Sequence, residues 1–286
     1  MTYKLVYVRG KKRLEFSISS GLVITSARGL TDQTVTIQAA DAAWDVGAVV
    51  EKQRVDPKTL SFNGIIRGDS GKMRSAMLDT IVPMEPAQLI ADDQWVLDVY
   101  PSATPDIERY TFNPGFSFTL YAPYPYWRAV EDTYSPMFGI QALFKFPWDF
   151  GKITRFSNKT ITNTINVYNP GTVRTGWSAT IYAREGIFNK PKLAHANTGE
   201  YIKVNIDMAK GDKIALDYHQ GILKCAYTPA GEETQDAFDK LDINSDPFQI
   251  LPGDNLITLT GDEGLIIHIS ADITFQRCVP GLPNGA

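Results

Sequence analysis

The sequence predicts a mainly β protein with two domains, residues 1–128 and 129–286. Three observations support this prediction. Apolar and polar residues alternate with a period of two in most segments, and Gly, Pro, Asn and Asp separate these segments at short intervals. The spacing of apolar residues that is typical of a helix stands out at one place. With 286 residues, the chain is also long enough for two domains of ordinary size.

The composition excludes several classes of protein. Hydrophobic residues make up 43% of the chain and charged residues 21%, which is typical of a globular protein and not of a disordered one. No apolar run reaches the roughly 18 residues that a membrane-spanning helix requires. The net charge of −4 argues against non-specific binding to nucleic acid or to an anionic membrane surface. We therefore expect neither a nucleic-acid partner nor a membrane partner.

The first domain begins with a predicted hairpin. Residues 3–8 and 14–18 alternate on either side of a turn at 9–12. Residues 39–56 include Trp44 and carry little turn chemistry in their middle, so we expect a long hairpin that reaches out of the domain as an arm. Further strands are predicted at 22–24, 33–38, 59–66, 95–100, 109–112 and 116–121.

One helix is predicted in this domain, after residue 69. Asp69 offers an N-cap, and Pro83 ends the pattern. Between them, apolar residues follow at helical spacing, at Met73, Ala76, Met77 and Ile81.

Two prolines among aromatic residues mark the domain boundary at 123–128, because proline cannot continue a central strand. The segment 132–158 is expected to be looser, and its aromatic residues suggest that it packs somewhere. Strands are then predicted at 164–168, 178–183, 201–206, 213–216, 222–226, 248–251, 256–259 and 265–275. Many short strands with regular turns are typical of a sandwich, and we expect 256–260 and 265–270 to form its last hairpin.

Residues that could carry chemistry are scattered. The three histidines, His195, His219 and His268, are far apart, and none has another His or a Cys at metal-ligand spacing. The adjacent acidic pairs at 92–93 and 232–233 would face opposite ways on a strand, so turns explain them better than a shared acid/base site. Asp254 and Asn255 also fit a turn. We therefore predict no catalytic, cofactor-binding or metal-binding residues, and no enzyme.

Two cysteines, Cys225 and Cys278, complete the inventory. The N-terminus alternates polar and apolar residues and shows no apolar core of a signal peptide. The sequence therefore favours synthesis in a reducing cytoplasm with both thiols free, and it does not require a bridge.

Several segments occur in an order that resembles one known family. In the first half these are LSFNG at 60–64, LIADDQW at 89–95 and FSFTLYAPYPYW at 116–127. In the second half they are NPGT at 169–172, NTGEYIKV at 197–204, KGDKIALD at 210–217 and LPGDNLI at 251–257. Their order, and the closing Pro-x-Pro-Tyr-Trp motif of the first half, resemble the distal tail protein (Dit) family of bacteriophages with long, non-contractile tails.

This resemblance implies a ring-forming N-terminal β-domain with one helix and an extended β-arm, and a galectin-like β-sandwich at the C-terminus. It implies a structural protein of the virion, assembled in the bacterial cytoplasm, whose six copies form a hub ring at the distal end of the tail. The implied partners are the tail tube protein, the tail-associated tip protein and receptor-binding proteins. No catalytic residue is implied.

The alternative is a soluble carbohydrate-binding β-sandwich module that contacts the bacterial cell wall. Galectins use a His-x-Asn-x-Arg run and a stacking Trp next to a Gly. Here His195 and Asn197 are followed by Gly199 in place of the arginine, and Trp177 follows Gly176 in a different context. We therefore expect His195 and Asn197 to be loop residues. A glycan-cleaving enzyme is a third hypothesis, which no carboxylate pair supports.

Overall fold

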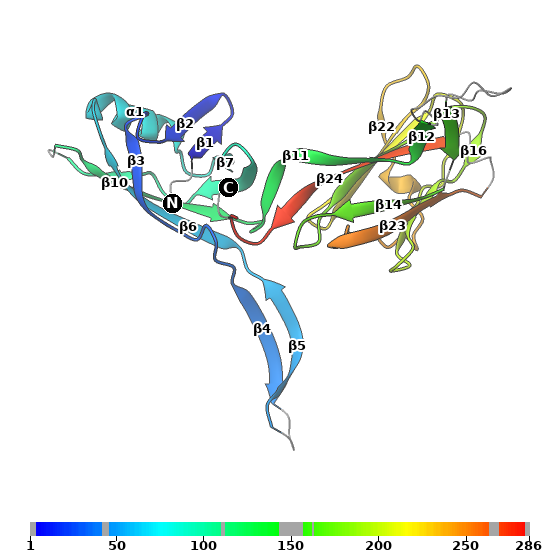
Figure 1. The fold of residues 1–286 in the computed structure, drawn as a ribbon, viewed down its shortest axis with the longest axis horizontal. Helices are drawn as coiled ribbons and strands as arrows, with labels where there is room; N and C mark the ends of the chain where they lie inside the picture. The colour runs from blue at the N-terminus through cyan, green and yellow to red at the C-terminus, as the bar shows by residue number, and fades with distance from the viewer. Residues whose placement is uncertain are drawn as a thin grey trace, which may run out of the picture. The chain divides into compact units, whose positions relative to one another are not determined.

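The computed structural model describes residues 4–41, 46–109, 112–142, 157–161, 163–262 and 269–283. These residues form mostly β-strands, with a single α-helix among them, so the predicted mainly β class is confirmed (Figure 1). None of the helices in the described ranges is long and apolar enough to cross a membrane.

The chain divides into two compact units, Met1–Glu131 with Cys278–Ala286, and Asp132–Arg277. The expected division into 1–128 and 129–286 differs mainly because the end of the chain returns to the first unit. There the Leu282 N–H donates to the Leu30 carbonyl at 2.9 Å, and the Lys58 ammonium donates to the Pro280 carbonyl at 2.7 Å.

The first unit contains one helix and the strands that precede the connector. In chain order they are β1 (Leu5–Arg9), β2 (Lys12–Phe16), β3 (Leu22–Arg28), β4 (Val35–Asp41), β5 (Ala48–Val55), β6 (Lys58–Ile66), α1 (Ser70–Thr80), β7 (Ala87–Ala91), β8 (Trp95–Pro101), β9 (Asp106–Ile107) and β10 (Gly115–Ala122). The predicted hairpin is β1–β2, with Tyr7 opposite Leu14. Strands β3, β6 and β10 pair in that order, and β10 also pairs with β8 and β9. A strand predicted at 109–112 is observed instead as β9, and residues 110–111 lie outside the described ranges.

Aromatic side chains fill the core of this unit. Phe118 stacks on Phe62, with ring centroids 4.9 Å apart, and on Phe16, at 5.3 Å. The predicted helix is confirmed as α1. The Asp69 carboxylate accepts a hydrogen bond from the Lys72 N–H at 3.1 Å, which satisfies one of the free donors of the first turn. The apolar face of the helix packs on the same core, through Met73, Ala76, Met77 and Ile81.

The connector between the units is anchored by Trp127. Its side chain is fully buried, and its indole N–H donates to the Leu30 carbonyl at 3.0 Å. Strand β11 (Trp127–Pro136) starts at this residue and is followed by β12 (Phe138–Ala142), which pairs with β13 (Ser157–Ile161). The expectation of a loose segment from 132 was therefore wrong at 132–142. Only Trp127 of β11 is buried and half of its residues are exposed, so its sequence lacks the apolar alternation that marks a half-buried strand.

The second unit is a two-sheet arrangement around one core. Its remaining elements are β14 (Thr164–Asn169), β15 (Trp177–Ala183), β16 (Phe188–Asn189), β17 (Lys192–His195), β18 (Tyr201–Lys203), β19 (Asp207–Met208), β20 (Lys213–His219), β21 (Ile222–Thr228), β22 (Gln235–Asp236), the 3-10 helix η1 (Phe238–Lys240), β23 (Gly253–Thr260) and β24 (Ile269–Val279). One sheet has the order β11-β24-β15-β20-β21-β22, and the other has the order β14-β23-β17-β18. Buried residues of both sheets, such as Ile181 and Leu193, belong to one hydrophobic cluster, which fits the predicted sandwich.

One predicted pairing and one predicted strand in this unit differ from the expectation. Strand β23 lies between β14 and β17, whereas β24 lies between β15 and β11, so the predicted hairpin of 256–260 with 265–270 was wrong. The alternation identified strands correctly, but both edges of each strand are occupied by other partners. Residues 248–251 form only an isolated bridge, between Ile250 and Thr175.

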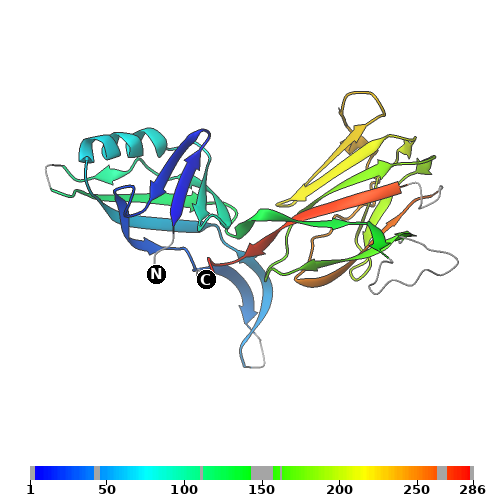
Figure 2. The same ribbon diagram turned by 45° about the horizontal axis from the view of Figure 1, so that its top comes forward.

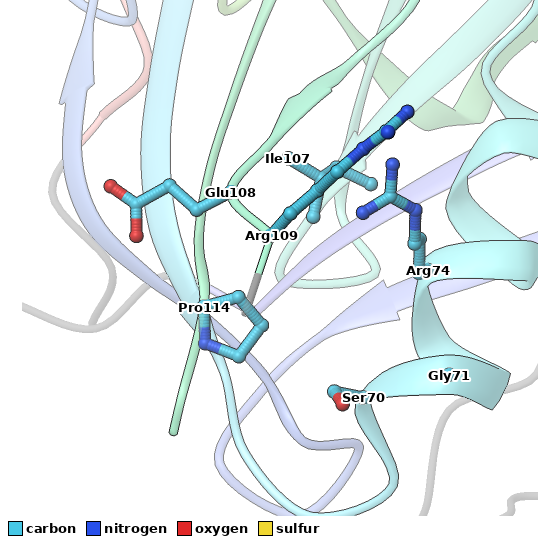
Figure 3. A pocket seen from close by; sticks show the side chains of 7 residues that line it. All are labelled: Ser70, Gly71, Arg74, Ile107, Glu108, Arg109 and Pro114. Atoms are coloured by element: carbon cyan, nitrogen blue, oxygen red, sulfur yellow. The ribbon is translucent and has the colours of Figure 1, made fainter. Parts of the chain in front are cut away.

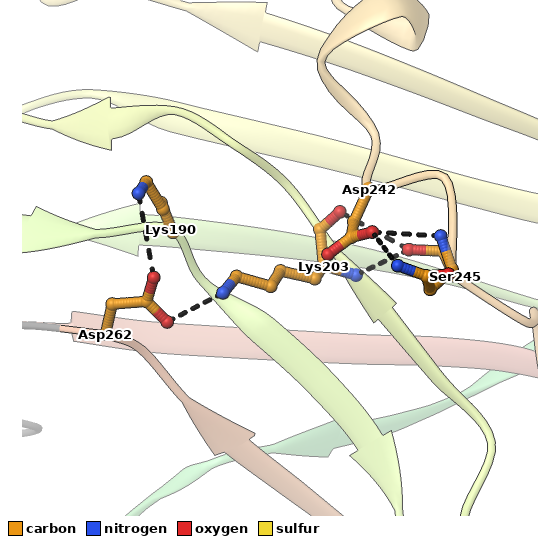
Figure 4. Close-up of polar contacts among 6 residues, drawn as sticks. Lys190, Lys203, Asp242, Ser245 and Asp262 are labelled. Atoms are coloured by element: carbon orange, nitrogen blue, oxygen red, sulfur yellow. Dashed lines mark hydrogen bonds and ion pairs between the residues drawn. The ribbon is translucent and has the colours of Figure 1, made fainter.

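Polar contacts of Lys203 in β18 reach two segments, Asp262 after β23 and residues 242–245 after η1. Asp262 forms an ion pair with Lys203 at 2.7 Å and a longer one with Lys190 at 3.7 Å (Figure 4). The Asp242 N–H donates to the Lys203 carbonyl, and the Lys203 N–H donates to the Ser245 hydroxyl. The partly exposed ion pairs of Asp262 contribute little, and the segment after η1 is held by the hydrogen bonds of the Lys203 backbone.

Asp212 holds the turn between β19 and β20. Its carboxylate accepts hydrogen bonds from the Tyr227 hydroxyl at 2.6 Å and from the N–H groups of Ala209 and Ala230, each at 2.9 Å. Burial by itself raises the pKa of Asp212, but the three donors together bring it below the ordinary value of 3.8.

We predict that Asp212→Asn lowers the stability of the second unit by about 1–3 kcal/mol at neutral pH, because it weakens hydrogen bonds to a charged acceptor. Since the pKa is lowered in the folded state, this stabilisation is present above pH 3.8 and is lost as the pH falls through the folded-state pKa. Urea unfolding at several pH values should show the two proteins converging in acid. A difference that stays constant with pH would contradict this explanation.

Candidate interaction surface

The predicted arm is a two-stranded hairpin formed by β4 and β5, which belongs to the first unit. It pairs with no further strand in the described parts of the chain, and every residue of β4 is exposed. In both views the hairpin extends away from the other strands of its unit (Figures 1 and 2). Trp44, which pointed to this arm in the sequence, lies outside the described residues.

Hydrogen bonds join the two strands of the arm to each other at its base. The Asp56 N–H donates to the Thr34 carbonyl at 2.9 Å, and the Thr36 hydroxyl donates to the Asp56 carboxylate at 2.7 Å. Just before the arm, Gly29 has a φ of +84°, and a Cβ there would lie 2.2 Å from the Thr59 carbonyl oxygen. Only glycine fits this close approach, so the chain leaves the sheet in a defined direction.

A β-bulge sets the two faces of the arm. Gln38 pairs with Lys52 and Ala39 pairs with Val50, which leaves Glu51 as the extra residue. Since residues directly opposite share a face, one face carries six apolar side chains and two polar ones, Asp41 and Gln53. The apolar ones are Val35, Ile37, Ala39, Ala48, Val50 and Val55. The other face carries Thr36, Gln38, Ala40, Val49, Lys52 and Arg54. The arm therefore has one mainly apolar face and one face that is polar and basic near its base.

The apolar face has no cover within the arm. Ile37 is 58% exposed and Val50 is 53% exposed. A two-stranded hairpin alone is marginally stable in water, and its edges present unpaired backbone groups. An anchored arm of this kind is therefore suited to binding another protein chain, by burying its apolar face and by pairing along its edges.

The structure also brings together three residues that the sequence analysis did not connect. The Ser178 hydroxyl donates to the Asp217 carboxylate at 2.6 Å, and His219 Nε2 lies 3.2 Å from that hydroxyl and 3.1 Å from the carboxylate. Ser178 and Asp217 are cross-strand partners on β15 and β20. The i, i+2 spacing of Asp217 and His219 was the available signal, because it places both on one face of a strand.

This cluster does not have the geometry of a nucleophilic triad. In a triad the acid orients one imidazole nitrogen while the other nitrogen accepts the serine proton. Here the acid and the serine share the same nitrogen, and the serine proton is directed at Asp217. The arrangement is a surface hydrogen-bond cluster between neighbouring strands.

The residues considered for sugar binding are not available for it. His195 lies at the end of β17, is fully buried, and has its Nε2 2.9 Å from Asn255 Oδ1, so its expected place in a loop was wrong. Asn197 does lie in a turn, where its side-chain oxygen accepts from the Leu256 N–H at 3.4 Å. Trp177 is fully buried, stacks on Phe248 and donates its indole N–H to the Phe248 carbonyl at 2.8 Å.

Thiols and metal ligands offer no further site in the described ranges. Cys225 and Cys278 are buried and form no disulfide, as predicted. Burial raises the pKa of the Cys225 thiol to about 12, so that it is unreactive. No group of three His, Cys, Asp or Glu side chains in the described residues could hold a metal ion. His268 lies outside those residues.

Comparison with known proteins supports the resemblance drawn from the sequence. Residues 170–270 match the family model of the siphovirus-type tail component, C-terminal domain. The crystal structure of the Dit protein (gp 19.1) of phage SPP1, described as a paradigm of the hub adsorption apparatus in phages that infect Gram-positive bacteria, matches with a TM-score of 0.67 and 11% identity. That match covers 97% of this chain and 99% of the SPP1 protein.

Chains of the phage P2 baseplate in its activated conformation, with Ca and with Sr, match with a TM-score of 0.51 and 11% identity. Each match covers 99% of this chain and 100% of the other. No curated protein matches the sequence. The likeness to these solved structures extends over nearly the whole chain and is a likeness of fold.

Proposed function

We propose that this chain is a distal tail protein, a structural component of a bacteriophage tail hub. Six copies form a ring at the distal end of the tail, in which residues 1–128 close the ring and residues 129–286 form a galectin-like peripheral domain. The observation that carries the proposal is the anchored arm, whose exposed apolar face lacks cover within its own hairpin. The fold shared with a phage hub protein supports the same role.

The arm would act as a clasp between neighbouring copies. A ring is built from head-to-tail contacts, in which a feature of one copy fits a different surface of the next. An arm with one apolar face provides such a feature. Full burial of an aliphatic side chain contributes about 1.5–3 kcal/mol, so the exposed Val35, Ile37 and Val50 would together stabilise a contact substantially.

The ring would join the tail tube protein to the tail-associated tip protein, and would carry receptor-binding proteins. The particle would be assembled in the bacterial cytoplasm and the protein would remain in the virion. This role requires interaction surfaces and no catalytic group. The residues that partly resemble the galectin pattern do not support the alternative, a soluble carbohydrate-binding module, because His195 and Trp177 are buried.

A matched pair of double variants tests the clasp. Ile37→Asp with Val50→Asp places two charges on the apolar face, and Gln38→Asp with Val49→Asp places two charges on the opposite face of the same arm. We expect the wild type and the opposite-face variant to show a mass near six times 31.8 kDa by light scattering, and the apolar-face variant to be monomeric.

Electron microscopy of the same fractions should show a ring with a central hole only where the mass is high. An apolar-face variant that assembles like the wild type would contradict the clasp. A wild-type chain that shows no ring, alone or in tails, would contradict the hub itself.

A further inference from the structure

The first unit contains a cavity of about 410 Å³ that is remote in sequence from the arm (Figure 3). It lies between the start of α1 and the segment that follows β9, and is lined by Ser70, Gly71, Arg74, Ile107, Glu108, Arg109 and Pro114. In Figure 3 the side chains of Arg74 and Arg109 extend toward the same region. Two positive charges therefore face one cavity.

The cavity lining carries two positive charges and one negative charge, that of Glu108, and neither arginine is paired with that carboxylate. Neither guanidinium group has a hydrogen bond or an ion pair with any residue that the structure describes. Glu108 points away from both arginines in Figure 3, and its carboxylate accepts from the Gly115 N–H at 2.9 Å. Asp69, next to the first turn of α1, uses its carboxylate on the Lys72 N–H. The nearby carboxylates are thus engaged by backbone donors.

The chemistry of the pair indicates what it would bind. Like charges that line one cavity repel each other, and an anion bound between them relieves this repulsion. A guanidinium group presents paired N–H donors that match the two oxygens of a carboxylate. A cavity of this volume is within the range that holds a small group such as a side chain. Residues 1–128 hold 14 basic and 14 acidic side chains, so the attraction is local and does not come from the net charge of the domain.

We propose that the Arg74–Arg109 cavity docks an acidic segment of a partner protein, with a carboxylate bound between the two guanidinium groups. The choice of a protein as the source of the carboxylate rests on the proposed function, in which this chain is surrounded by other tail proteins. The residues of the arm take no part in this contact. The cavity would add a polar, charge-specific contact to the apolar contact that the arm makes.

The test measures binding of a fluorescein-labelled hexaglutamate peptide to the full chain by fluorescence anisotropy at low salt. We compare the wild type with Arg74→Gln plus Arg109→Gln. The control is Arg28→Gln plus Arg67→Gln, which removes the same charge from two other exposed arginines of this unit. We expect the cavity variant to bind at least tenfold more weakly, a difference of about 1.4 kcal/mol, and the control to change less than twofold.

Three results would overturn the proposal. In the first, the wild type does not bind the peptide. In the second, both double variants lose the same affinity, which would show that binding follows the overall charge. In the third, inorganic phosphate at matched ionic strength displaces the peptide where chloride does not, which would assign the cavity to a small anion.

Light scattering on the same variants separates this proposal from the hub. The cavity variant should keep the mass of the wild type, because the cavity receives a different protein. Loss of assembly in this variant alone would make a second copy the source of the carboxylate and would overturn the proposal as stated. A monomeric wild type that still binds the peptide through both arginines would support the cavity while contradicting the hub.

Discussion

Trp127→Ala should lower the free energy of unfolding of the first unit by about 3–5 kcal/mol, the range measured for removal of a large buried aromatic side chain. The indole is fully buried in the core of this unit. Its N–H donates to the Leu30 carbonyl, which also accepts from the Leu282 N–H at 2.9 Å. One carbonyl thus joins the connector, the segment before the arm and the end of the chain, and alanine would leave a cavity at this junction.

Trp127→Phe separates the two contributions of the indole. Phenylalanine keeps most of the buried volume and loses the N–H, while the Leu30 carbonyl keeps its bond from Leu282. We therefore expect a cost near the net value of one hydrogen bond, about 1 kcal/mol, plus a smaller cavity term. Hydrogen exchange followed by mass spectrometry along a urea series reads each unit by its own peptides. Equal loss of protection in both units, or no loss in the alanine variant, would contradict the assignment.

The strands that the sequence predicted well are those with one buried face. In β6 and β10 burial alternates from residue to residue, so most apolar positions in the sequence are buried positions in the structure. The helix α1 was predictable for a comparable reason, because Asp69 caps it and its apolar residues recur at helical spacing. The arm was predictable because the middle of residues 39–56 contains few of the residues that form turns.

Pairing and burial at the ends of strands were not predictable. The alternation of β23 and β24 is clear, but alternation does not say which strand lies alongside, and these two belong to different sheets. His195 and Asn255 stand beside turns in the sequence and are fully buried in the structure. A local pattern assigns such residues to solvent, because it does not show the hydrogen bond that joins these two positions across 60 residues of chain.

The candidate sites also combine features that a local sequence pattern predicts with features that it does not predict. The arm could be expected from the sequence, yet which residues share its apolar face depends on the bulge at Glu51, which shifts the register by one residue. Arg74 and Arg109 are separated in the chain by three strands, β7, β8 and β9, and line one cavity only because β9 pairs with β10. No spacing rule connects two such residues.

Asn255 provides the second large effect. Its side-chain oxygen accepts from the Leu251 N–H at 2.8 Å and lies 2.9 Å from His195 Nε2. Its side-chain nitrogen donates to three carbonyls within 3.1 Å, those of Val167, Leu251 and Gly253. Since the oxygen must accept from Leu251, His195 has to donate from Nε2. The other ring nitrogen then accepts from the Thr198 N–H at 3.3 Å, which fits a neutral imidazole.

Asn255→Ala should therefore lower the stability of the second unit by at least about 3 kcal/mol, because each buried group left without a partner costs about 1–3 kcal/mol. Asn255→Asp separates lost volume from lost donors. It keeps the shape and both acceptors, but it directs a carboxylate at three carbonyl oxygens, so we expect a comparable loss at neutral pH.

Asn244→Ala, at an exposed turn of the same unit, is the control and should change stability by less than about 0.5 kcal/mol. Urea unfolding of the four proteins gives the comparison. If Asn255→Asp were as stable as the wild type, the side-chain nitrogen would not be the group that holds these three backbone segments together. The turn would then depend on the acceptor alone, and the link between His195 and the rest of the sheet would be the main contribution of Asn255.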